Sequence, residues 1–103
     1  MAPVELTVIL VADPGKAKRF LELFSKAAEH VEANEPLVDR YEIHKCVEDV
    51  NGKEQYVIYE SYQTQEAFDM HMKASPVQTM FQSLEQDGLQ IIQTTRGSGI
   101  TPR

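Results

Sequence analysis

Three residues near the middle of the sequence combine acid–base chemistry with hydrogen bonding: Glu60, Tyr62 and His71. Histidine can take a proton near neutral pH, tyrosine can donate a hydrogen bond to a developing oxyanion, and a carboxylate can orient either group. Together they could remove the proton of a substrate hydroxyl and stabilise the anion that forms. They could equally be structural, with Glu60 and His71 as a buried polar pair that fastens a helix to a sheet.

The local pattern indicates which elements carry these residues. Side chains alternate over residues 55–63 with aromatic residues on both faces, which predicts a strand with Glu60 and Tyr62 on the same side. Thr64 can then cap a helix, and His71 lies on the apolar stripe of that helix. The imidazole is therefore expected to face the strand.

The rest of the chain supplies five further elements. They are a strand over Val4–Ala12, a helix capped by Asp13 with an apolar stripe from Ala17 to Val31, a strand over Val38–Glu48, a second short helix after Pro76, and a strand over Leu89–Thr95. The pair Asn51–Gly52 predicts a tight hairpin between the two middle strands. This order of elements is that of a ferredoxin-like α+β plait, βαββαβ, with an antiparallel sheet.

Size and composition limit the alternatives. The 103 residues predict one domain over 1–103, in which residues 97–103 form a loose tail or lie across a partner subunit. Because the formal charge is −6, nucleic acid and anionic membranes are not expected as partners. Cys46 is the only cysteine, and no spacing of His, Cys or acidic residues predicts a metal site. The N-terminus has neither a signal-peptide pattern nor a span-length apolar run, so a cytoplasmic location is expected.

The central segment resembles the motif of the antibiotic biosynthesis monooxygenase family. In that family a strand ending in Glu, one residue and an aromatic leads into Glu-Ala-hydrophobic, then His, then Ser-Pro. The matching residues here are Glu60, Tyr62, Glu66, Ala67, Phe68, His71, Ser75 and Pro76. Glu35–Pro36 also resembles the family's Glu-Pro-Gly turn, with Leu37 where glycine is usual.

The resemblance implies both an assembly and an activity. It implies a dimeric α+β barrel, in which the sheets of two copies pack face to face, and this agrees with the apolar residues on both faces of the predicted strands. It also implies a cofactor-independent monooxygenase that uses O2 to oxidise a small hydrophobic phenolic, quinol or lipid-derived metabolite. In such enzymes the deprotonated substrate passes an electron to O2 and the two radicals combine.

Two alternatives remain within the same fold. One is a small-ligand-binding protein without chemistry of its own, because a fold does not establish a function. The other is a haem-degrading relative, which the sequence disfavours. That branch has Trp at the position of Tyr62, Asn in the first strand near Val8, and a histidine ligand near Gln82.

A substrate pocket is expected between the helices and the sheet. Its predicted apolar lining is Phe20, Phe24, Phe68 and Met72, together with Tyr62. Small-ligand sites are usually apolar with a few well-placed polar groups, and this set has that character.

Overall fold

The computed structural model describes residues 3–98 and contains one antiparallel sheet of four strands. The strands are β1 (Val4–Ala12), β2 (Val38–Lys45), β3 (Glu54–Tyr62) and β4 (Gln90–Gly97), in the spatial order β2-β3-β1-β4. With its three helices the chain has the predicted βαββαβ arrangement of a ferredoxin-like plait. The last strand runs two residues further than expected, and the remainder of the predicted tail, 99–103, lies outside the described residues.

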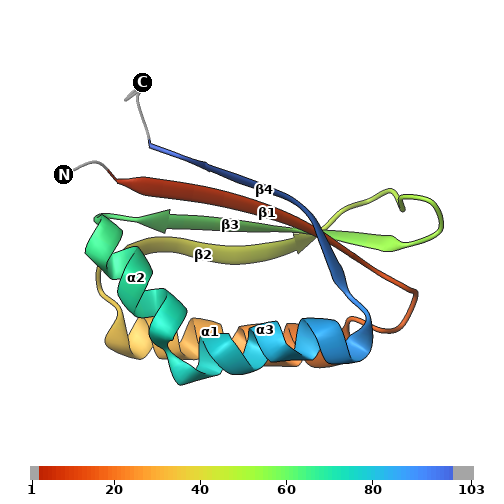
Figure 1. Cartoon of the computed structure of the whole chain (residues 1–103), viewed down its shortest axis with the longest axis horizontal. Coiled ribbons are helices and arrows are strands. Elements are labelled where there is room, and N and C mark those ends of the chain that lie inside the picture. Colours follow the sequence, from red (N-terminus) through yellow and green to blue (C-terminus); the bar gives the residue numbers. More distant parts are fainter. Residues whose placement is uncertain (1–2, 99–103) are drawn as a thin grey trace.

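All three helices lie on one face of the sheet (Figure 1). They are α1 (Lys18–Asn34), α2 (Gln65–Lys73) and α3 (Ser75–Asp87). The predicted break near Pro76 is confirmed, since the segment after β3 forms two helices. The break lies before Pro76, which is tolerated in the first turn of α3 but would clash inside a longer helix.

The main core lies between this helical layer and the sheet. Helix α1 buries one stripe at helical spacing, made of Phe20, Phe24, Ala27 and Val31. The helix starts later than predicted: its first residue is Lys18, and the residue before it is Ala17 and not Asp13. Asp13 instead pairs with Lys53 in the β2–β3 loop, where Lys53 Nζ lies 2.8 Å from its carboxylate.

Tight turns set the strand pairing. Asn51 and Gly52 both have positive φ, 52° and 78°, as the predicted hairpin turn requires, and β2 pairs with β3 antiparallel. Strand β2 ends at Lys45, three residues before the predicted end. Gly88, with φ of 73°, ends α3 in the left-handed conformation and returns the chain to the sheet.

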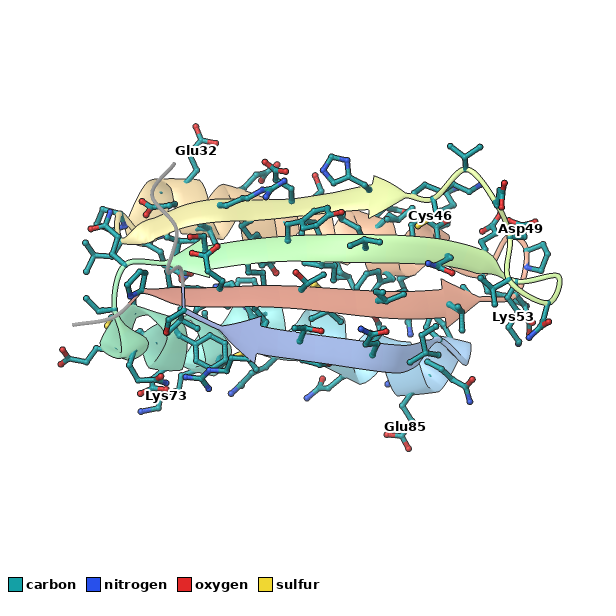
Figure 2. The ribbon with its side chains drawn as sticks, turned by 90° about the horizontal axis from the view of Figure 1, so that it is seen from above. Glu32, Cys46, Asp49, Lys53, Lys73 and Glu85 are labelled. Carbon is teal, nitrogen blue, oxygen red and sulfur yellow. The ribbon has the colours of Figure 1, made fainter. Side chains whose placement is uncertain are left out.

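The other face of the sheet carries no helix among the described residues. Figure 2 looks directly onto it, with the four strands in front and the helices behind. The alternation of β3 places Val57 and Tyr59 on this face, where Val57 pairs with Ile9 of β1. All three are only half-buried. An incompletely covered apolar strip therefore runs across the middle of the sheet.

Candidate functional site

Tyr62 and Glu60 meet on the helix-covered face of β3. They are two positions apart on one strand, so both side chains point into the layer beneath the sheet, as the alternation predicts. The Tyr62 hydroxyl donates a hydrogen bond to Glu60 Oε1, and both residues are buried. Burial raises the pKa of Glu60, and the bond from Tyr62 opposes that rise in part. Burial also raises the pKa of Tyr62, so its hydroxyl stays protonated.

His71 lies where the sequence predicts, on the buried stripe of α2 facing the sheet. Thr64 caps this helix by accepting a 3.0 Å hydrogen bond from the Ala67 amide, which fixes the position of its first turn. The His71 residue is 1% exposed. Its ring lies between two tyrosines, with centroid distances of 4.7 Å to Tyr41 and 5.4 Å to Tyr62.

The carboxylate partner of His71 is Glu35 rather than Glu60. His71 Nδ1 lies 3.0 Å from Glu35 Oε1, and the Glu35 side chain is 9% exposed. Glu60 is already bonded to Tyr62, so the expected Glu60–His71 pair is replaced by two separate pairs. Both pairs lie in one buried region, since the Tyr62 and His71 rings are near neighbours.

Glu35 is held at the turn between α1 and β2. Its amide donates to Val31 O at 2.8 Å and ends the helix, while its carbonyl accepts from the Val38 amide at 3.1 Å. Pro36 disfavours helical backbone at Glu35 and so contributes to the same break. The sequence pattern places Glu35 only in a turn. The available signal was a carboxylate just before a proline in the family-like turn, but nothing in the spacing indicated its partner 36 positions away.

Two of the predicted pocket residues lie in the core. Phe20 and Phe24 are buried side by side on α1, and Phe24 stacks on Tyr41 with a centroid distance of 4.5 Å. Phe68 is half-buried, edge-on to Tyr62 at 5.2 Å. Met72 is 37% exposed on α2. The structure thus brings Phe68 next to Tyr62, whereas Met72 points outward.

Two hollows flank Glu35. One has a volume of about 220 Å³ and is formed by the α1–β2 turn and α2; its walls are Asn34, Glu35, Pro36, Leu37, Val38, Ala67 and Met70. The other, of about 340 Å³, lies between α1 and the end of α2 and includes His30 and Lys73. They share Asn34, Glu35 and Met70, so a molecule in either hollow would touch the residue that binds His71.

The geometry equips His71 to act as a base. An ionised carboxylate can only accept hydrogen bonds, so the Nδ1–H of His71 donates to Glu35 and Nε2 keeps a free lone pair. Nε2 has no hydrogen-bond partner within residues 3–98. Burial lowers the pKa of His71, and the Glu35 charge opposes this only in part, so the imidazole is neutral at pH 7.

Solved structures with the same fold come from several organisms. A candidate antibiotic biosynthesis monooxygenase from Caulobacter crescentus CB15 superposes with a TM-score of 0.79 at 18% identity, covering 97% of this chain and 92% of its own. A second candidate antibiotic biosynthesis monooxygenase, from Nitrosomonas europaea, superposes with a TM-score of 0.74 at 18% identity. The match covers 99% of this chain and 95% of that one. A conserved protein from Methanosarcina mazei Go1 superposes with a TM-score of 0.73 at 16% identity, and the match covers 96% of this chain and 92% of that one. At such identities the likeness establishes the fold alone.

Sequence comparison identifies the family. No curated protein matches the chain. The family model described as antibiotic biosynthesis monooxygenase matches residues 4–83, which include β1, α1, β2, β3, α2 and most of α3. The match also contains Glu35, Glu60, Tyr62 and His71. The chain therefore belongs to the antibiotic biosynthesis monooxygenase family.

Proposed function

We propose that this protein is a monooxygenase that uses O2 to oxidise a small hydrophobic metabolite carrying an acidic hydroxyl, such as a phenolic polyketide, a quinol or a lipid-derived enol. The observation that carries the proposal is the buried His71, whose Nδ1 lies 3.0 Å from Glu35 Oε1 and whose Nε2 has no hydrogen-bond partner among residues 3–98. The family description supplies the reaction class.

The reaction begins with proton transfer. The substrate O–H bond breaks, an Nε2–H bond forms on His71, and the resulting imidazolium is stabilised by the Glu35 carboxylate. The Tyr62 hydroxyl leaves its hydrogen bond to Glu60 and donates instead to the substrate oxyanion. The anion gives an electron to O2, and the radical pair combines through a new C–O bond into a peroxide that takes the proton back from His71. Loss of a second hydrogen from the same carbon, with cleavage of the O–O bond, leaves one oxygen atom in the product as a carbonyl and releases the other as water. The substrate supplies both electrons and both hydrogens.

Substrate access requires α2 to move. Tyr62 is fully buried and His71 almost so, although a reacting molecule must reach both. Helix α2 has nine residues and buries only Ala67 and His71, so it is held less firmly than α1 or α3. Its displacement would extend the 220 Å³ hollow toward Tyr62, with Phe68 and Met72 as lining residues of the opened pocket. Phe24, which stacks on Tyr41, would form the floor of that pocket, and Phe20 would pack next to Phe24.

The same burial supports a second candidate, a ligand-binding protein without turnover. Closed polar pairs such as Tyr62–Glu60 and Glu35–His71 also stabilise a fold without any chemistry. In that case the hollows beside Glu35 would hold a ligand, and O2 would not be consumed.

One screen tests both candidates. Quinols, anthrones and oxidised fatty acids are assayed first by thermal shift; at a hundredfold excess over Kd a ligand adds about 2.7 kcal/mol to stability. The compounds that raise Tm are then incubated with the protein in an oxygen electrode. Consumption of one O2 per oxidised product supports the monooxygenase. Stabilisation without O2 uptake supports the binding protein, and no stabilisation across the panel contradicts both.

A further inference from the structure

The Glu35 carboxylate lies between two imidazoles. Oε1 is 3.0 Å from His71 Nδ1, and Oε2 is 3.4 Å from His30 Nε2, within ion-pair distance but without the alignment of a hydrogen bond. Side-chain exposure rises along this series, from 1% at His71 through 9% at Glu35 to 31% at His30. The series therefore leads from the buried base to the protein surface.

Asn34 fixes the orientation of His30. Its Nδ2 donates to the His30 main-chain carbonyl at 3.1 Å, which identifies that atom as the amide nitrogen, because a carbonyl can only accept. The same nitrogen lies 3.3 Å from His30 Nδ1. Nδ1 is then the accepting nitrogen of the ring, and the ring proton is on Nε2, which faces Glu35.

We propose that Asn34, His30 and Glu35 form a positioning chain that fixes His71 in the tautomer with its proton on Nδ1 and a bare Nε2. Asn34 orients His30, the His30 ring lies 3.4 Å from the outer oxygen of Glu35, and the inner oxygen of Glu35 accepts the hydrogen bond from His71. The catalytic value of the chain rests on the proposed function, but its effect on the tautomer does not. Within residues 3–98 no group of three or more His, Cys, Asp or Glu side chains is arranged to hold a metal ion.

The other groups around the chain do not compete for this role. Tyr41 of β2 and Tyr62 of β3 present ring edges or faces to His71, and Glu60 is engaged by Tyr62. Lys73 of α2 shares the 340 Å³ hollow with His30 and Glu35 but is exposed. Glu35 is thus the only carboxylate bonded to His71 among the described residues.

The test is 15N NMR of the two histidine rings in the wild-type protein at neutral pH, where protonated and bare nitrogens of a neutral imidazole have well-separated shifts. We expect His71 with a protonated Nδ1 and a bare Nε2, and His30 with the reverse. A protonated Nε2 on His71 would overturn the proposal. Because the measurement needs no substrate, it remains decisive even if the screen for turnover fails.

Glu35→Gln tests the cause. The amide can donate or accept, so His71 should become a mixture of tautomers, and any measured kcat should fall about 100-fold with little change in KM. The matched control is Glu42→Gln, which alters an exposed carboxylate 3.1 Å from His44 Nε2. An unchanged His71 tautomer in folded Glu35→Gln, or an equal change in the control, would contradict the positioning role.

Discussion

Glu35 Oε1 and His71 Nδ1 are 3.0 Å apart, although the two residues are separated by 36 positions in the sequence. The bond joins the α1–β2 turn to α2, two segments that have the whole β2–β3 hairpin between them in the chain. His71 is the only buried ionisable side chain of α2, and it is therefore held by a residue of the α1–β2 turn. Orientation of the candidate base depends on this contact rather than on the strand beneath it.

Replacing Tyr62 with Phe should destabilise the protein. Glu60 would lose its hydrogen-bond donor while staying buried, at a cost of about 1–3 kcal/mol. Urea unfolding of Tyr62→Phe measures this cost. The control is Tyr59→Phe on the helix-free face, where the loss should be smaller. If both variants lose the same free energy of unfolding, the Tyr62–Glu60 hydrogen bond contributes no more to stability than the partly exposed hydroxyl of Tyr59.

Glu60 should make stability fall as pH rises. Burial raises its pKa in the folded protein above the value of about 4.3 expected for the unfolded chain, so the folded state binds a proton that the unfolded state has lost. This contribution is complete below that pH and is lost as pH rises through the folded pKa. Thermal unfolding of wild type and Glu60→Gln from pH 4 upward should therefore diverge in favour of the variant. Parallel curves would contradict the raised pKa.

His71 has the opposite linkage. Its pKa is lowered in the folded protein, so the stability that it contributes is present above about pH 6.5 and is lost as pH falls through the folded value. The NMR titration of the His71 ring should accordingly have its midpoint below 6.5. A midpoint above 6.5 would mean that the Glu35 charge outweighs burial, and His71 would then be partly protonated in the resting protein.

Local signals in the sequence predicted most of the fold. The alternation of β3, the Thr64 cap, the Asn51–Gly52 hairpin and the break at Pro76 each depend on neighbouring residues, and all are found in the structure. Asp13 could not be placed in this way, because its pairing with Lys53 competes with capping. The same limit hid the link of Glu35 to His71 and His30, which needs the packing of two helices against one turn.

Phe20 and Met72, both predicted to line the pocket, should respond very differently to truncation. Phe20→Ala removes a ring that is fully packed beneath the sheet and should cost about 3–5 kcal/mol. Met72→Ala changes a half-exposed side chain on α2 and should leave stability within about 0.5 kcal/mol. Denaturant midpoints of the two variants measure the difference. A large loss at Met72 would mean that α2 is packed more tightly than its exposure indicates.

A homodimer formed through the helix-free face remains our prediction. Val57 lies near the middle of that face, half-buried between Ile9 and His44, and a charge there could not be buried against a second sheet. Val57→Lys should convert a light-scattering dimer into a monomer. Val47→Lys, at a fully exposed position beyond β2, should leave the dimer intact. A wild-type protein that is monomeric at micromolar concentration would contradict the prediction.

Whether His71 accepts the substrate proton is tested most directly by His71→Gln. The glutamine amide can still donate to Glu35, so the fold should survive with Tm within a few degrees, but the side chain cannot act as a base. The measurement is the initial rate of O2 consumption by wild type and variant with one substrate identified in the screen. The account predicts a loss of about 100-fold or more. An unchanged rate in the folded variant would contradict it.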